Sequence, residues 1–596
     1  MMSRTPTSPP GRRLGRSLRP RRGPRALAAV SAALCASALT LAAGGGAAQA
    51  STTATSGDGA ALAVTPPMGW NDWAHYQCGV TEAIVEANAR ALVSSGLAAK
   101  GYTTVTVDDC WMASSRDANG DLVANSATFP DGMAALGTYL HGLGLKFGIY
   151  EDAGSSTCGG YPGSGAPNGG GADHFAQDAK TFASWGVDYL KLDGCNVYVP
   201  SGETSEQAYQ NAYAAENAAL RASGRDIVFS ESAPAYFQGG SERGTPDWYT
   251  VLGWTGEYGQ LWREGYDIAT YDASSPNTSR FASVLSNYDY NRWLVRYAGP
   301  GDWNDPDFLI AGDSGLTATQ SRAQVSLWAM MSAPLILSSD VAALSTQSVA
   351  DLGNSGILAL DQDPLGRQGA VVSSDGTTDV LVKPLANGDR AVAFLNTGSA
   401  TETASTTTAS MGFTATGQSG CSFSVKDLWA GTTSTTSGAI SASVPSDGTA
   451  VLRVTPSAGC AAATPTGQLV GNGGKCADDS GSGTADGNPV ILYPCTGNTN
   501  QRWAVDADGT VRTLGKCLSA QNGGTAAGTV VVLSTCTGAA GQLWQYGQQG
   551  QQSGELVDKA SGLCLDVYGG GSANGAELDT WTCGTHQLNQ IWSLPD

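Results

Sequence analysis

The segment VDYLKLDGC, residues 187–195, shows the pattern that decides the fold of the larger part of this chain. Its apolar and aromatic residues, interrupted by Asp188 and Lys191, lead to a polar end at Asp193, which is typical of a buried strand of a parallel sheet. Three other segments have the same form, namely TTVTVDDCW (103–111), KFGIYEDAG (146–154) and DIVFSESA (226–233).

Helical patterns lie between these segments. TEAIVEANARALVSSGL (81–97) begins with Thr followed by Glu, and its apolar residues recur every three to four positions. GMAALGTYLHGLGL (132–145) has a similar pattern. Strands and helices alternate over roughly 300 residues, which predicts a (β/α)8 TIM barrel over residues 51–365.

The pattern changes beyond the predicted barrel. The segment GAVVSSDGTTDVLVKPLANGDRAVAFLNTG (369–398) alternates apolar and polar residues between Asp-Gly and Asn-Gly-Asp turns. This alternation predicts antiparallel strands, and we expect an antiparallel β-sandwich domain over residues 366–456. The Ala-, Pro- and Thr-rich residues 457–466 then predict a linker.

The C-terminal residues 467–596 contain three repeats. Each repeat carries two cysteines 19 positions apart: Cys476 and Cys495, Cys517 and Cys536, Cys564 and Cys583. Each repeat also ends in Gln-x-Trp, at Gln501 and Trp503, Gln542 and Trp544, Gln590 and Trp592. Three equal spacings indicate one structural unit repeated three times.

The first 50 residues predict a secretory signal peptide. Eight arginines precede an apolar run over residues 26–43, and Ala48-Gln49-Ala50 offers a cleavage site of small residues. The apolar run consists largely of Ala and Ser, which makes it weak as a membrane anchor. We therefore expect a secreted, extracellular protein.

Charge argues against several classes of partner. The chain has 32 basic and 52 acidic residues, and eight of the basic residues leave with the signal peptide. Nucleic acids and anionic membranes are bound by basic surfaces. We expect no nucleic-acid partner and no membrane association, because no later segment is apolar enough to span a bilayer.

The cysteine count also bears on the compartment. Of the 13 cysteines, Cys35 lies in the signal peptide, and an even twelve remain. In an exported chain twelve cysteines predict six disulfides, although the sequence leaves open whether Cys421 and Cys460 pair. There is no CxxC pair and only four histidines, none at ligand spacing, so we expect no metal site.

Carboxylates gather where the predicted barrel strands end, which is the face that carries the active site in such barrels. They are Asp108, Asp109, Glu151, Asp152, Asp193, Glu231, Asp267, Asp302, Asp305 and Asp307. Aromatic residues interleave them: Trp70, Trp73, Trp111, Tyr150, Tyr189, Tyr236 and Trp303. Carboxyl pairs among aromatic rings suit the cleavage of glycosidic bonds.

Six motifs in order resemble glycoside hydrolase family 27, the α-galactosidases, α-N-acetylgalactosaminidases and their relatives. They are TPPMGWNDW (65–73), VDDCWM (107–112), KFGIYEDAG (146–154), YLKLDGCN (189–196), LWREGYDI (261–268) and AGPGDWNDPDFL (298–309). The resemblance covers about residues 62–455. It implies a barrel followed by a β domain, and no cofactor.

The resemblance implies a catalytic pair. The family's nucleophile is the Asp of its Lys-Tyr-Asp-x-Cys strand end, here Asp193, with Leu192 in place of the usual Tyr. The family's acid/base is the Asp of Arg-x-x-x-Asp, here Asp267 after Arg263. Lys191 is the cation next to the nucleophile and is expected to favour its ionised form.

The resemblance also implies a sugar pocket and two disulfides. Asp108 and Asp109 match the aspartates that hold the O4 and O6 hydroxyls of galactose, and Trp73 matches the ring that stacks on the sugar. Arg263 fits a clamp for a sugar hydroxyl. Tyr150, Lys191 and Tyr236 complete the implied substrate-binding set. The implied barrel disulfides join Cys78 to Cys110 and Cys158 to Cys195.

One departure from the family concerns the sugar's 2-position. In animal α-galactosidases a Glu, and a Leu three residues later, crowd this position; here Ser232 and Ala235 stand in their places. Small side chains leave room for an N-acetyl group, as in the α-N-acetylgalactosaminidases. Two alternatives stay open: loop variation without a change of specificity, or a one-residue shift that returns Glu231 to the pocket.

The three C-terminal repeats resemble the ricin-type β-trefoil, a lectin fold also called carbohydrate-binding module family 13. The resemblance implies that the Asp, aromatic and Asn of a repeat bind sugar. The first repeat has Asp478, Tyr493 and Asn500, and the third has Asp566, Trp581 and Asn589. The second has Ser519, Ser534 and Gly541 instead, so it is expected to lack a site.

Taken together, these features predict a retaining exo-glycosidase that removes terminal α-linked galactose or N-acetylgalactosamine and binds polysaccharide through its trefoil. A β-L-arabinopyranosidase of the same family and a secreted lectin with an inactive barrel are the alternatives. The pair Asp193 and Asp267 argues against the inactive lectin.

Overall fold

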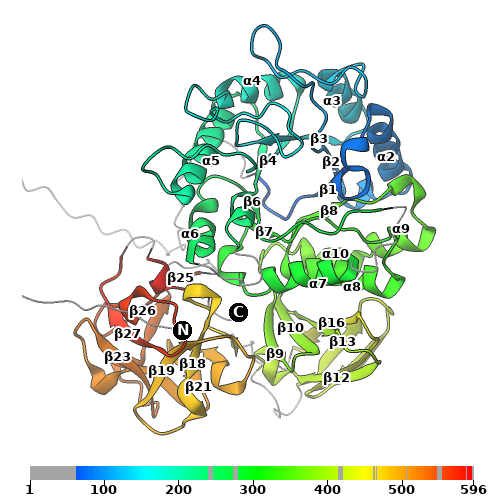
Figure 1. Cartoon of the computed structure of the whole chain (residues 1–596). Helices are drawn as coiled ribbons and strands as arrows, with labels where there is room; N and C mark the ends of the chain where they lie inside the picture. The colour runs from blue at the N-terminus through cyan, green and yellow to red at the C-terminus, as the bar shows by residue number, and fades with distance from the viewer. Residues whose placement is uncertain are drawn as a thin grey trace, which may run out of the picture. The chain divides into compact units, whose positions relative to one another are not determined.

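The structure is a computed structural model (Figure 1). It describes residues 62–238, 246–272, 280–413, 421–458, 460, 464, 466–506, 508–546, 553–584 and 587–593. The predicted signal peptide therefore lies outside the described residues, as do part of the predicted linker and the first residues of the predicted barrel. Within the described part, no helix combines the length and the apolar character needed to cross a bilayer.

Eight parallel strands form the N-terminal sheet, and the first seven pair in sequence order, each with the next. The strands are β1 (Met68–Asn71), β2 (Thr104–Val107), β3 (Lys146–Asp152), β4 (Tyr189–Asp193), β5 (Val228–Glu231), β6 (Leu261–Arg263), β7 (Trp303–Asp305) and β8 (Leu335–Leu337). β8 pairs with β1, and Leu309, just after β7, bridges to Leu337 of β8. The sheet is thus closed, and the predicted barrel is confirmed.

The helices lie outside the ring of strands (Figure 1). They are α1 (Trp73–Tyr76), α2 (Glu82–Ser94), α3 (Met133–Gly142), α4 (Phe175–Trp185), α5 (Ser205–Ala222), α6 (Pro246–Thr255), α7 (Arg280–Asn291), α8 (Ala318–Met331), α9 (Thr346–Leu352) and α10 (Ser355–Asp361). The Thr81 side chain accepts a hydrogen bond from the backbone N–H of Ile84 and so caps α2, as its sequence suggested. A capping box of Thr317 and Gln320 begins α8.

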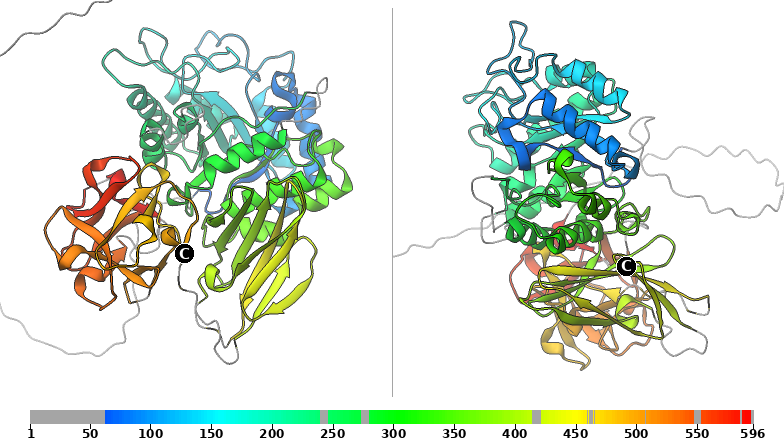
Figure 2. Two further views of the ribbon diagram at one scale, coloured as in Figure 1. Left: turned by 60° about the horizontal axis from the view of Figure 1, so that its bottom comes forward. Right: turned by 90° about the vertical axis from the view of Figure 1, so that its right-hand side faces the viewer.

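The next domain is an antiparallel β-sandwich (Figure 2, yellow-green). One sheet holds β14 (Thr433–Thr436), β13 (Phe423–Asp427), β16 (Gly448–Pro456), β11 (Arg390–Asn396), β10 (Thr378–Pro384) and β9 (Ala370–Ser374), in that spatial order. The other holds β12 (Glu402–Thr407) and β15 (Ala439–Val444). Their shared core includes Phe394 and Phe423 from the first sheet and Ile440 from the second, as expected for two sheets packed face to face.

The C-terminal domain is the β-trefoil. Its strands are β17 (Thr466–Gly467), β18 (Cys476–Asp479), β19 (Asn488–Tyr493), β20 (Trp503–Val505), β21 (Val511–Thr513), β22 (Lys516–Ala520), β23 (Thr529–Ser534), β24 (Trp544–Tyr546), β25 (Ser553–Asp558), β26 (Cys564–Val567), β27 (Ala576–Trp581) and β28 (Ile591–Ser593). The three Gln-x-Trp tryptophans occupy its core. The indole N–H groups of Trp503, Trp544 and Trp592 donate to carbonyls at equivalent places in the three repeats. This threefold pattern explains why every repeat keeps its tryptophan.

All six expected disulfides form. The barrel carries Cys78–Cys110 and Cys158–Cys195, and the trefoil repeats carry Cys476–Cys495, Cys517–Cys536 and Cys564–Cys583. Cys421 and Cys460, whose pairing the sequence left open, are also bonded.

Candidate active site and lectin sites

The predicted barrel residues meet at the carboxyl ends of the parallel strands. Asp108 and Asp109 follow β2, Asp193 ends β4, Ser232 follows β5, and Arg263 ends β6. Apolar residues that precede these polar ones, such as Val107 and Leu192, are buried in the barrel, and the polar residues stand at or just after the ends of the strands. The strand ends therefore bring residues that are far apart in sequence to one open end of the barrel, which we call the mouth.

Two tyrosine hydroxyls hold the Asp193 carboxylate. The hydroxyl of Tyr236 donates to Oδ1 at 2.6 Å, and that of Tyr150 lies 3.1 Å from Oδ2. The backbone N–H of Gly194 donates to Oδ1 at 2.9 Å. Burial and then the charge of Asp193 raise the pKa of Tyr236, so this tyrosine stays protonated as a donor. The carboxylate is thus fixed in orientation by donors on both oxygens.

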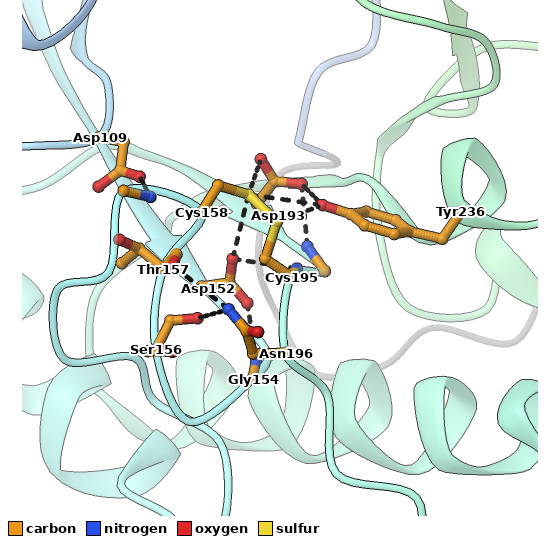
Figure 3. The surroundings of a disulfide bond; sticks show 12 residues. Asp109, Asp152, Gly154, Ser156, Thr157, Cys158, Asp193, Cys195, Asn196 and Tyr236 are labelled. Atoms are coloured by element: carbon orange, nitrogen blue, oxygen red, sulfur yellow. Dashed lines mark hydrogen bonds between the residues drawn. A yellow bond between two sulfur atoms is a disulfide. The ribbon is translucent and has the colours of Figure 1, made fainter.

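The Cys158–Cys195 disulfide forms one wall beside this carboxylate (Figure 3). Its Cys158 Sγ lies 3.7 Å from Asp193 Oδ2, and its Cys195 Sγ lies 3.2 Å from the Tyr236 hydroxyl. Burial, followed by the charge of Asp193, raises the pKa of the neighbouring Asp152. Asp152 accepts a hydrogen bond from the backbone N–H of Cys195 and so helps to hold this loop.

Lys191 makes its ion pair with Asp108. Its Nζ is 2.8 Å from Asp108 Oδ2, and Asn71 Nδ2 donates to the same oxygen at 2.6 Å. Burial works to lower the pKa of Lys191, but the charges of Asp108 and then Asp193 raise it above its usual value. Lys191 therefore pairs directly with Asp108 and interacts with Asp193 only through the longer-range attraction of their charges.

Asp109 is oriented by backbone N–H groups. Cys110 donates to Oδ1 at 2.6 Å and Gly159 to Oδ2 at 2.7 Å. Trp73, partly exposed at the start of α1, is placed by a 2.8 Å bond from its N–H to Asn71 Oδ1. Asn71 therefore supports both the aspartate pair and the tryptophan. Asn71 was not among the predicted site residues, although it stands at the end of the first strand within the motif of residues 65–73.

Asp267 follows β6 and pairs with Arg263 at the end of that strand. Its side chain is 75% exposed, and its Oδ1 accepts from Arg263 Nη2 at 3.0 Å. Partial desolvation works to raise the pKa of Asp267, but the charges of Arg263 and Lys191 lower it overall. The same Arg263 nitrogen lies 3.1 Å from Oδ2 of the buried Asp307. One arginine is thus shared by two carboxylates.

The register of β5 decides which side chain faces the mouth. Lys191 pairs with Ser230 and Leu192 with Glu231. Side chains alternate along strands, so Glu231, like the core residue Leu192, points away from the mouth, and Ser232 follows on the mouth side. Glu231 is fully buried against Gly259, and burial raises its pKa. The alternative that returns Glu231 to the pocket is therefore wrong.

Ala235, partly exposed, lies in the short 3-10 helix of residues 233–236.

In the third trefoil repeat the predicted sugar-binding side chains lie together. Asp566 Oδ2 accepts from Asn589 Nδ2 and from Gln590 Nε2, both at 2.7 Å. Trp581 is 48% exposed beside them. Together they line a hollow of about 520 Å³.

The first repeat has a related arrangement. Asp478 accepts from Gln501 Nε2 at 2.7 Å, Tyr493 is 42% exposed, and Asn500 donates to the backbone carbonyl of Asp479 at 3.0 Å. In the second repeat Ser519 is buried and bonds to the backbone of its own strand. The structure thus shows a carboxylate with an exposed ring in repeats one and three.

Within the described part of the chain, one group of three side chains lies close enough to hold a metal ion, namely Asp152, Cys158 and Cys195. Because the two sulfur atoms are bonded to each other, this group is not a set of free ligands.

Comparison with known families agrees with each domain. The α-galactosidase A family model matches residues 65–363. The α-galactosidase C-terminal β-sandwich model matches residues 375–454, and the ricin-type β-trefoil lectin model matches residues 465–592.

Individual relatives give the same picture. The chain is 42% identical over 452 residues to α-galactosidase A of Aspergillus niger, which covers 76% of this chain and 79% of that protein. The structure of α-galactosidase I from Mortierella vinacea has a TM-score of 0.56 at 28% identity and covers 67% of this chain and 99% of its own. That of the Saccharomyces cerevisiae α-galactosidase with raffinose has a TM-score of 0.57 at 27% identity, covering 66% and 98%. This chain therefore belongs to the α-galactosidase A family of glycoside hydrolases and carries, in addition, a ricin-type β-trefoil lectin domain.

Proposed function

We propose that the protein is a secreted, retaining exo-α-galactosidase in which Asp193 is the nucleophile and Asp267 the acid/base. One observation carries this proposal. The mouth of the barrel holds two carboxylates in contrasting surroundings, Asp193 between two tyrosine hydroxyls and Asp267 on an arginine. Lys191 carries a charge that acts on both. A glycosidase needs two such carboxyl groups in different roles.

In the first step an Asp193 oxygen attacks the anomeric carbon of a terminal α-galactoside, and the bond to the leaving oxygen breaks. Asp267 gives its proton to that oxygen. In the second step Asp267 takes a proton from water, and the water oxygen attacks the anomeric carbon and releases Asp193. Two inversions give a product that retains the α-configuration.

The proposed sugar pocket uses the residues around this pair. The carboxylates of Asp108 and Asp109 are fixed by Lys191, Asn71 and backbone N–H groups. Their remaining lone pairs can accept hydrogen bonds from the O4 and O6 hydroxyls, while Trp73 stacks on the sugar. A fixed carboxylate pair of this kind favours the axial O4 of galactose over the equatorial O4 of glucose.

A second candidate activity is the hydrolysis of α-N-acetylgalactosaminides. It is favoured by the orientation of the segment after β5, where Ser232 follows on the mouth side and Glu231 points away. With Ala235 three residues later, neither position carries a bulky side chain to exclude an acetamide group.

A panel of p-nitrophenyl glycosides tests both activities. We expect turnover of the α-galactoside and of the α-N-acetylgalactosaminide, and little of the β-L-arabinopyranoside. The double change Ser232→Glu and Ala235→Leu should reduce the kcat/KM ratio of N-acetylgalactosaminide to galactoside by at least about tenfold, because a lost fit in a pocket costs roughly 1–3 kcal/mol. A wild type without activity on the N-acetylgalactosaminide contradicts the second candidate. A wild type inactive on every glycoside contradicts the proposed enzyme and leaves an inactive lectin.

We propose that the trefoil binds galactose-type sugars or polysaccharide through repeats one and three. The support is chemical: these repeats present a ring for the sugar face and a carboxylate with an amide for its hydroxyls. The first repeat offers Tyr493, Asp478 and Asn500, and the third offers Trp581, Asp566 and Asn589. Ser534 and Gly541 give the second repeat neither group.

The double variant Asp478→Ala and Asp566→Ala should abolish binding to galactose-rich polysaccharide, and each single variant should remove about half the sites. Since tethering raises the effective concentration of enzyme on a polymer, the double variant should lose activity on polysaccharide but keep it on p-nitrophenyl galactoside. Isothermal titration gives the number of sites. Ser519→Ala is the matched control in the second repeat and should change nothing. Three sites in the wild type, or binding that survives the double change, contradicts the proposal.

A further inference from the structure

Asp307, which the proposed mechanism does not use, has an unusual backbone conformation. Its φ is +76°, in the left-handed region that few residues other than glycine adopt, although asparagine and aspartate do so more often than the rest. Its side chain is buried. The indole N–H of Trp328 donates to its carbonyl at 2.8 Å, and its own N–H donates to Asp305 Oδ1 at 2.8 Å. A strained backbone conformation that several hydrogen bonds hold in place is typical of residues with a role in a functional site.

The Asp307 carboxylate contacts the residue that follows the proposed acid/base and the arginine that pairs with it. Its Oδ2 accepts from the backbone N–H of Ile268, the residue after Asp267, at 2.7 Å. The same oxygen is 3.1 Å from Arg263 Nη2. Through these contacts one carboxylate fixes the chain that carries Asp267 and the cation that pairs with it.

Arg263 uses a single nitrogen for both carboxylates. Nη2 is 3.0 Å from Asp267 and 3.1 Å from Asp307, so neither carboxylate has the whole charge of the guanidinium. Among the described residues, the charged groups that act on these three residues include Lys191, Glu264 and Asp305. Burial raises the pKa of Asp307 overall, although the charges of Arg263 and Lys191 oppose this. The pKa of Asp267 is lowered overall, and the charge of Lys191 contributes to that lowering.

We propose that Asp307 is a positioning residue for the acid/base, which fixes the backbone beside Asp267 and takes a share of the Arg263 charge that would otherwise fall on Asp267. This inference rests on the proposed function, because it assigns Asp307 a part in the proton transfer by Asp267.

The sign of the effect follows from electrostatics. Removal of the negative charge at position 307 ends its repulsion of the Asp267 carboxylate. It also leaves Asp267 as the one negatively charged partner of this pair that interacts with Arg263. Both changes favour the carboxylate form of Asp267 and lower its pKa. A general acid must be protonated, so the alkaline limb of the pH profile of kcat/KM should move to lower pH.

Two variants separate charge from position. Asp307→Asn removes the charge, suits the left-handed backbone, and keeps an oxygen that can accept from Ile268. Asp307→Gly also suits this backbone but removes both functions. The matched control is Asp313→Asn, since Asp313 is a partly buried aspartate that also pairs with a buried arginine, Arg280, at 3.1 Å.

The pH profile of kcat/KM should be measured with p-nitrophenyl and with dinitrophenyl α-galactoside, whose leaving group needs little protonation. In Asp307→Asn we expect the alkaline limb for the p-nitrophenyl substrate to move down by about one pH unit, while Asp313→Asn leaves it in place. Above the limb this shift lowers kcat/KM about tenfold. The dinitrophenyl substrate should be much less affected. Asp307→Gly should show the same shift with a further loss of kcat, because the Asp267 segment is no longer held.

A double-variant cycle gives an independent test. Added to Asp267→Ala, the change Asp307→Asn should have almost no further effect, since residues that act through one another are not additive. An unmoved limb in Asp307→Asn, an equal shift in Asp313→Asn, or full additivity with Asp267→Ala overturns the inference. Failure of the proposed function is distinguishable, because then the wild type itself lacks turnover or Asp267→Ala leaves it unchanged.

Discussion

The Asp193→Ala variant is expected to lose at least about four orders of magnitude in kcat on every α-galactoside, as removal of a covalent nucleophile does elsewhere. The galactosyl-enzyme intermediate cannot form without the carboxylate. The fold should survive, because the Tyr150 hydroxyl keeps Asp152 Oδ2 as a second acceptor at 3.4 Å, and water can reach the 39% exposed Tyr236, which loses its bond to Asp193. Steady-state kinetics together with a thermal unfolding scan checks both parts.

The control for this experiment is Asp226→Ala. Asp226 is an exposed carboxylate before β5, at the opposite end of the barrel, and its loss should leave kcat unchanged. Residual activity above about one percent in Asp193→Ala, with an intact fold, contradicts the assignment of the nucleophile.

The Asp267→Ala variant is expected to lose about 10²–10⁴-fold in kcat/KM on substrates with poor leaving groups, the range typical of general acid catalysis. Raffinose carries such a leaving group. For dinitrophenyl α-galactoside the loss should be small, since that leaving group departs without a proton. Because the Asp267 side chain is 75% exposed, its truncation should cost little stability. Equal losses on both substrates contradict the role of Asp267 as acid/base.

Much of the site could be predicted from the sequence because parallel strands carry polar residues at their carboxyl ends. Asp108 and Asp193 stand at the polar ends of predicted strands, and the barrel brings such ends together whatever their distance in sequence. The trefoil was predictable for another reason. Its core repeats three times, so that the glutamines and tryptophans recur at the same spacing.

The partners of charged side chains could not be predicted in the same way. Lys191 stands two residues from Asp193 in sequence, yet its ammonium group reaches across to Asp108, which lies on a different strand. Likewise the sequence alone did not decide whether Glu231 or Ser232 faces the sugar pocket. The strand register was needed to show that the Glu231 side chain points away from it. The importance of Asp307 depends on its backbone conformation and on Ile268, neither of which a motif displays.

The central claim, that Asp193 attacks the sugar, is tested most directly by the product that Asp193→Ala forms from dinitrophenyl α-galactoside in the presence of azide. Azide can enter the space that the carboxylate leaves and attack the same face of the sugar. We expect renewed release of dinitrophenol and formation of a β-galactosyl azide, identified by the configuration at its anomeric carbon in the NMR spectrum. An α-galactosyl azide, or no rescue of the correctly folded variant by azide, would contradict this claim.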